Sequence, residues 1–171
     1  DYALTSADVN PADTSWTLTA NLPGMASPAV VNLQVKAAPA YWLASFSMNP
    51  SLPPYSYQYT GMTSLNIATL YEGYALIPLL DGRPAATREE LEQSGITAAD
   101  SADPYLIQAT PRLLNFTDSS GKTSQVWGLC LAALAENAVS ESRTLTVSRN
   151  GESVGTVAYT LDGMNNNGNR T

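Results

Sequence analysis

Apolar and polar residues alternate along much of the chain, and this period of two predicts β-strands. The clearest stretch is VVNLQVK at residues 30–36, in which every second residue from Val31 onward is apolar. One face of such a strand is apolar and the other polar, which is typical of a half-buried strand in an antiparallel sheet. The same reasoning predicts strands at residues 14–21, 41–48, 55–60 and 65–80, the last interrupted near Glu72-Gly73 and at Pro78.

A tight turn near the C-terminus is predicted at Asn150-Gly151, because the commonest two-residue hairpin turn requires positive φ at both positions. This turn joins residues 144–149 to residues 152–161, and both stretches alternate. The two form a predicted β-hairpin in which Arg149 lies opposite Glu152 as a favourable cross-strand pair.

The second strand of this hairpin changes phase along its length. Val154 has an even number, whereas the apolar positions from Val157 onward are odd. A strand with a period of two cannot bury both sets on one face. We therefore predict a β-bulge at Gly155-Thr156, which places Val157 opposite Leu145.

A second hairpin is predicted over residues 112–127. Its turn, Asp118-Ser-Ser-Gly121, contains a glycine suited to the left-handed conformation, and the resulting register places Asn115 opposite Gln125 and Leu114 opposite Val126. The next apolar run, residues 129–138, fits either a helix or a central strand, and we favour a strand for residues 126–131.

One short helix is predicted at residues 87–93. Thr87 and Glu90 have the spacing of a capping box, and Gly95 supplies a signal for the helix end. Residues 97–103 are expected to add a further short turn.

These elements predict a mainly β fold, a single antiparallel β-sandwich or jelly-roll-like domain of about eight or nine strands with one short helix near residues 87–94. We expect an N-terminal arm at residues 1–13, the sandwich domain at 14–163 and a disordered polar tail at 164–171, which is rich in Asn and Gly.

The composition excludes several kinds of chemistry. The chain has no histidine, so a Ser-His-Asp triad, a Cys-His pair and a histidine-based zinc site are impossible. Its one cysteine, Cys130, lies in an apolar run and fits a buried side chain. A net charge of −7 argues against binding to nucleic acid or an anionic membrane surface. No stretch has the roughly 18 apolar residues of a membrane-spanning helix, so we expect no membrane insertion.

No residue can be assigned to catalysis, to a cofactor or to a metal ion, and we expect a protein that is not an enzyme. The feature most suggestive of binding is a stripe of three tyrosines, Tyr55, Tyr57 and Tyr59, which the alternation of a strand directs to one face. Tyr41 and Trp42 are expected nearby. Such a face is either part of the core or a contact surface for a protein or a sugar.

Only 13% of the residues are charged, well below the usual quarter or so, and this composition is common in exported proteins and filaments. The chain begins at Asp1 and not at Met, which we interpret as a secreted mature chain or an excised surface domain. The sequence therefore predicts a structural module of an extracellular or surface assembly, of the filament, coat or capsid-protrusion type, that associates with itself or with a surface partner. The alternatives are an adhesin or glycan-binding module and a carboxylate-dependent hydrolase.

Overall fold

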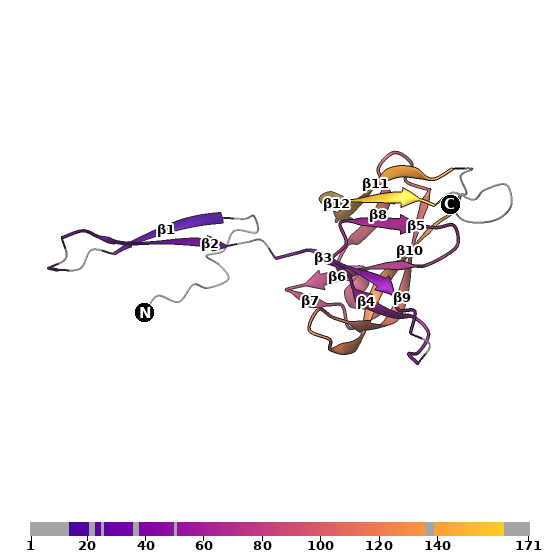
Figure 1. Ribbon diagram of the computed structural model, residues 1–171, viewed down its shortest axis with the longest axis horizontal. Coiled ribbons are helices and arrows are strands. Elements are labelled where there is room, and N and C mark those ends of the chain that lie inside the picture. The colour runs from indigo at the N-terminus through magenta and orange to yellow at the C-terminus, as the bar shows by residue number, and fades with distance from the viewer. Residues whose placement is uncertain are drawn as a thin grey trace. The chain divides into compact units, whose positions relative to one another are not determined.

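The computed structural model describes residues 14–20, 23–24, 26–35, 38–49, 51–135 and 139–162, and the protein is mainly β (Figure 1). Contacts divide the chain into two units, Asp1–Pro39 and Ala40–Thr171. The sequence predicted a single domain at residues 14–163 and did not predict this division. The expected arm at residues 1–13 and tail at residues 164–171 lie outside the described residues.

The first unit contains a two-stranded antiparallel hairpin of β1 (Thr14–Ala20) and β2 (Ala29–Val35). The register pairs Trp16 with Leu33 and Leu18 with Val31. Directly opposed residues of an antiparallel pair share a face. One face of the hairpin therefore carries the apolar positions of both strands except Val30, together with Thr14, and the other face carries Val30 and the remaining polar positions.

The second unit begins with a small barrel-like sheet. Its strands are β3 (Tyr41–Phe46), β4 (Ser56–Tyr59), β6 (Tyr74–Leu80), β9 (Ile107–Thr117) and β10 (Thr123–Ala133). The ring closes because β6 pairs with both β3 and β10. A two-residue strand, β7 (Arg83–Pro84), extends the sheet beyond β6.

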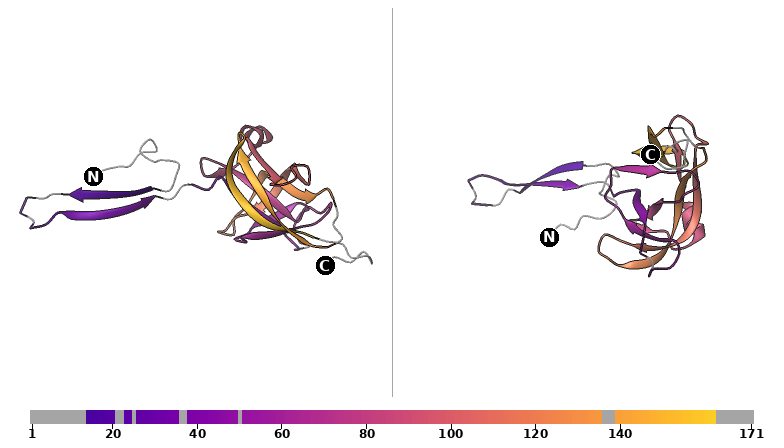
Figure 2. Two further views of the ribbon diagram at one scale, coloured as in Figure 1. Left: turned by 90° about the horizontal axis from the view of Figure 1, so that it is seen from above. Right: turned by 45° about the vertical axis from the view of Figure 1, so that its right-hand side comes forward.

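A second sheet contains four strands in the order β5 (Ser64–Ile67), β12 (Glu152–Leu161), β11 (Glu141–Arg149) and β8 (Ile96–Asp100). The long strands β11 and β12, orange to yellow in the figures, run side by side (Figure 2). β5 joins the edge of β12 as a parallel strand.

Two apolar clusters form the core of this unit, and β10 contributes to both. Leu129 and Leu131 belong to the larger cluster, which includes residues of the second sheet, whereas Cys130 belongs to the smaller cluster formed by barrel residues. A strand buried on both faces has a continuous apolar sequence. This explains why periodicity alone left residues 129–138 open between helix and strand, and it confirms the strand predicted for residues 126–131.

Both predicted hairpins are confirmed, with their registers. Arg149 pairs with Glu152, and Asn150 and Gly151 have the positive φ values of 52° and 86° that their turn requires. Asn115 pairs with Gln125 in the second hairpin. The predicted bulge exists, but the extra residue is Val154 and not Gly155-Thr156, because Gly155 pairs with Val147 and Ser153 with Ser148.

The helix is confirmed as α1 (Arg88–Gln93), capped by Thr87, whose side chain accepts a hydrogen bond from the Glu90 amide. Two local expectations were wrong. Pro78 lies within β6 and does not break it, because β6 pairs with β10 only as far as Leu76. The stretch expected to form a short turn after the helix is strand β8, which pairs with β11. The described part of the chain contains twelve strands, whereas the sequence predicted eight or nine.

Candidate functional site

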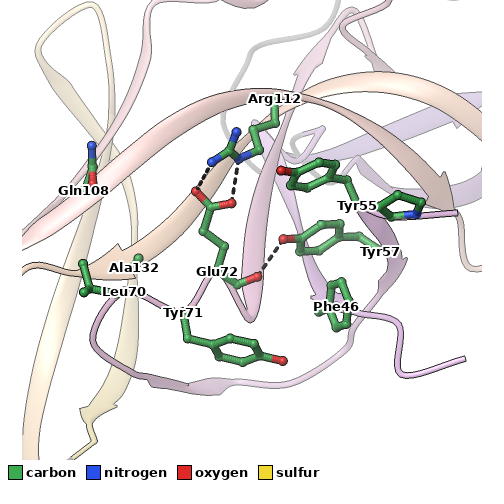
Figure 3. A pocket seen from close by; sticks show the side chains of 10 residues that line it. Phe46, Tyr55, Tyr57, Leu70, Tyr71, Glu72, Gln108, Arg112 and Ala132 are labelled. Atoms are coloured by element: carbon green, nitrogen blue, oxygen red, sulfur yellow. Dashed lines mark hydrogen bonds and ion pairs between the residues drawn. The ribbon is translucent and has the colours of Figure 1, made fainter. Parts of the chain in front are cut away.

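A pocket of about 410 Å³ opens on the barrel between β9, β4 and the connection from β5 to β6 (Figure 3). β4 and β9 pair over only three residues each, so the chain before β4 and the first half of β9 are free to diverge. Four aromatic rings and one ion pair line the space that this leaves. They are Phe46, Tyr55, Tyr57, Tyr71 and the pair Glu72–Arg112.

The ion pair lies along one wall of the pocket. Arg112 donates two hydrogen bonds to Glu72, from Nε to Oε2 at 2.6 Å and from Nη2 to Oε1 at 2.9 Å. Such a two-pronged bond fixes the orientation of both groups. The hydrogen bond to Glu72 raises the pKa of Arg112 above its ordinary value, so the guanidinium stays charged. Its Nη1 makes no hydrogen bond to any described residue.

The backbone around Glu72 forms a tight turn in which the Gly73 amide donates to the Tyr71 carbonyl at 3.0 Å. Gly73 is needed here for space, because a Cβ at this position would lie 2.8 Å from the Tyr71 ring. The turn directs the Glu72 carboxylate towards Arg112 and its carbonyl towards Tyr57, as Figure 3 shows.

Tyr57 forms the inner wall and is only 2% exposed. Its hydroxyl donates to the Glu72 carbonyl at 2.6 Å and accepts from the Cys130 thiol at 3.4 Å. Burial raises the pKa of Tyr57 far above its usual range and that of Cys130 to about 11. Both groups are neutral near pH 7, so Cys130 acts as a buried hydrophobic side chain and not as a nucleophile.

Tyr55 forms the outer wall. It precedes β4 with a positive φ of 59°, and its ring is 45% exposed. The Arg112 guanidinium carbon lies 5.0 Å from the centre of this ring, within the range of a cation–π contact. Tyr71, which is also partly exposed, meets Phe46 edge to face at 6.4 Å. The pocket thus combines apolar ring surfaces with one fixed pair of opposite charges.

The arrangement offers binding chemistry and little for catalysis. Glu72 is the only carboxylate among the lining residues, and Arg112 holds it. A neighbouring hollow of about 270 Å³ shares Phe46 and Tyr71 and contains one carboxylate, Asp162. Glycoside hydrolysis in its usual form needs two carboxyl groups flanking the same bond. Among the described residues, no group of three or more acidic or cysteine side chains could hold a metal ion.

The structure separates the five candidate contact residues. Tyr55 and Tyr57 both line the pocket, although only Tyr57 is buried. Tyr59 and the half-buried Trp42 meet edge to face at 6.2 Å, outside the pocket. Tyr41 packs elsewhere, since its hydroxyl would be 2.7 Å from a Cβ at Gly155. The tyrosines do not form one uniform face, because the left-handed conformation of Tyr55 places it before the alternation of β4 begins.

Sequence reasoning missed the ion pair and Phe46. Glu72 and Arg112 are 40 residues apart, and neither belongs to a motif. Their contact depends on how the connection after β5 crosses β9, which no local pattern encodes. The Tyr-Glu-Gly run at Tyr71 was the one available signal, since it combines an aromatic ring, a charge and a residue common in turns.

The β1–β2 hairpin is the second candidate surface. Among the described residues its strands pair in a sheet only with each other. Neither strand contains a charged residue or a proline. These are the features that usually protect an exposed edge from pairing with another chain.

Comparison with known proteins gives no family for this chain: no protein-family model, no curated protein and no solved structure matches it. Within the described part of the chain, no helix is long and apolar enough to cross a membrane.

Proposed function

We propose that this protein is a non-catalytic structural subunit of an extracellular or surface assembly and that it acts through protein–protein contacts. The observation that carries this proposal is the β1–β2 hairpin, which forms a sheet of only two strands among the described residues. A two-stranded hairpin alone is at best marginally stable in water. It gains stability when a further strand or surface covers it.

The partner that fits best is a second copy of this chain. The hairpin has one mainly apolar face and forms no sheet with a third strand among the described residues, so another hairpin of the same kind can add to its edge and share that face. The chain as a whole carries a net charge of −7, which opposes self-association. The absence of charge from β1 and β2 places the contact where this repulsion is weakest.

The second unit suits the same role. We propose that its barrel-like sheet and four-stranded sheet together form a β-sandwich-like body, because one apolar cluster contains residues of both sheets. Sandwiches of this kind serve many functions, so the fold supports the proposal without deciding it. A carboxylate-dependent hydrolase is less favoured, since each of the two hollows contains a single carboxylate.

Two double variants test the hairpin. Leu18→Lys with Val31→Glu places a charged pair at opposed apolar positions, and Thr19→Lys with Val30→Glu places the same pair at opposed positions of the other face. Both pairs are cross-strand and of opposite charge, so the hairpin itself is retained in each case. Light scattering after size exclusion, with negative-stain microscopy of the same fractions, measures assembly.

We expect the full chain and the T19K/V30E variant to form oligomers or polymers, and the L18K/V31E variant to be monomeric. A full chain that remains monomeric at every concentration would contradict self-assembly. Equal assembly of the two variants would show that the apolar face of the hairpin is not the contact.

A further inference from the structure

We propose that the pocket beside Tyr55 binds a neutral saccharide ring, held by the Glu72–Arg112 pair and stacked on the exposed tyrosine. This proposal is independent of the hairpin, because every residue that lines the pocket belongs to the second unit. The argument rests on the charge, the hydrogen-bonding groups, the ring surfaces and the size of the site.

The charges of the pocket disfavour an ionic ligand. A phosphate or carboxylate attracted by Arg112 would meet the Glu72 carboxylate, which is bonded to the same guanidinium. A quaternary ammonium group seeks aromatic faces, but the positive charge of Arg112, whose guanidinium carbon lies 5.0 Å from the centre of the Tyr55 ring, repels a second cation there. The two charges compensate each other, so a neutral polar ligand involves the smallest electrostatic cost.

The hydrogen-bonding groups match a pair of neighbouring hydroxyls. Arg112 retains N–H donors at Nη1, and the Glu72 oxygens retain lone pairs beyond the two bonds between the side chains. A sugar hydroxyl both donates and accepts, so adjacent hydroxyls can accept from Arg112 and donate to Glu72. Their orientation is fixed beforehand by the two-pronged bond, which reduces the entropy lost on binding.

The aromatic rings supply the apolar side of the same site. The C–H face of a pyranose ring is apolar, and a half-exposed tyrosine offers a flat surface with little conformational entropy to lose. Tyr55 and Tyr71 are both exposed by more than two fifths, whereas Tyr57 is buried beneath them. Figure 3 shows Tyr55 and Tyr57 beside the ion pair and Tyr71 below it.

The size of the pocket fits one small ligand. Its volume of about 410 Å³ is near the lower end of the range of about 300–1,000 Å³ for small-molecule sites. The exposed side chains Leu70 and Gln108 stand at its border. A terminal sugar of a longer glycan could therefore enter while the rest of that glycan stays in solvent.

The test uses the full chain and four probes, the methyl glycosides of glucose, galactose, mannose and N-acetylglucosamine, followed by saturation-transfer NMR and titration. Inorganic phosphate, phosphocholine and an unstructured peptide serve as competing ligand classes. Tyr55→Ala removes the stacking surface, and Gln108→Trp, at an exposed position, fills the border of the pocket. Tyr105→Ala is the matched control, because Tyr105 is an exposed tyrosine that does not line the pocket.

We expect at least one glycoside to bind, with affinity reduced at least tenfold by Y55A and by Q108W and unchanged by Y105A. Thermal unfolding verifies that each variant is folded. If the Y55A variant does not fold, the Q108W variant still tests the proposal. The proposal is overturned if no glycoside binds, if binding is insensitive to Q108W, or if phosphate, phosphocholine or the peptide binds in place of the sugars.

Discussion

At the scale of single residues, Asp100 is the group on which the second sheet depends most. It is 4% exposed and accepts five hydrogen bonds: two from Arg143, one from the Tyr159 hydroxyl at 2.7 Å and two from the amides of Ala102 and Asp103. These contacts join β8, β11 and β12 through one carboxylate. A buried charge is tolerated because all its partners are present, so losing one member is costly.

We predict that Asp100→Asn lowers the free energy of unfolding by about 3 kcal/mol, because it removes the buried carboxylate that Arg143 contacts and leaves only the half-exposed Glu141 as a charged partner. Urea denaturation measures the change. Glu92→Gln is the matched control: it makes the same chemical change in an ion pair whose side chains are 61% and 64% exposed, and we expect a loss within about 0.5 kcal/mol. Equal losses in the two variants would contradict this ranking.

The same carboxylate predicts a loss of stability in acid. The hydrogen bonds from Arg143, followed by those from Tyr159 and the two amides, hold the pKa of Asp100 well below its ordinary value. Its contribution is therefore complete above the unfolded pKa of about 3.9 and is lost as the pH falls towards the folded pKa. We expect the urea midpoint to fall more steeply below about pH 4 in the wild type than in D100N. Parallel curves would refute the assignment.

At the scale of elements, the end of α1 is fitted to the turn between β11 and β12. The Asn150 amide donates to the Gly95 carbonyl at 2.9 Å, and Gly95 has a φ of +62°. A Cβ at Gly95 would collide with the side-chain amide of Asn150. The helix end and the hairpin turn are thus packed against each other, 55 residues apart in sequence.

We predict that Gly95→Ala destabilises the protein by more than the roughly 1 kcal/mol that the positive φ alone costs. Gly82→Ala isolates that cost, since Gly82 has a φ of +79° and open space around it. In an Asn150→Gly background, the loss caused by G95A should shrink by about 1 kcal/mol, because the colliding side chain is gone. Thermal unfolding of the four proteins measures this double-mutant cycle. Losses of stability that simply add would exclude the collision.

The elements also show how far local patterns reach. Turn residues fixed both hairpin registers, and the capping box fixed the helix start, because these features depend on neighbours in sequence. The ring closure of β6 on β10 was not predictable, since it joins two apolar strands that could each pair with many others. The pocket was only partly predictable for the same reason. Tyr55 and Tyr57 were proposed from the sequence, but Glu72 and Arg112 come together only through this topology.

At the scale of the whole molecule, the two units differ in how they are stabilised. Both apolar clusters of the second unit consist of residues at or after Tyr41. The β1–β2 hairpin contributes no described residue to either cluster. The second unit therefore contains its own core, whereas a two-stranded hairpin alone is at best marginally stable in water.

We predict that residues 40–171 alone fold with the same urea midpoint as the full chain, within the error of the measurement. The reason is that, among the described residues, both apolar clusters and all strand pairings of the second unit consist of residues after Pro39. Circular dichroism and tryptophan fluorescence, which reports on Trp42 and Trp127 in both proteins and also on Trp16 in the full chain, follow the transition. The same fragment should lose the assembly of the full chain. A lower midpoint would show that the N-terminal unit supports the body, and assembly of the fragment would move the contact surface away from the hairpin.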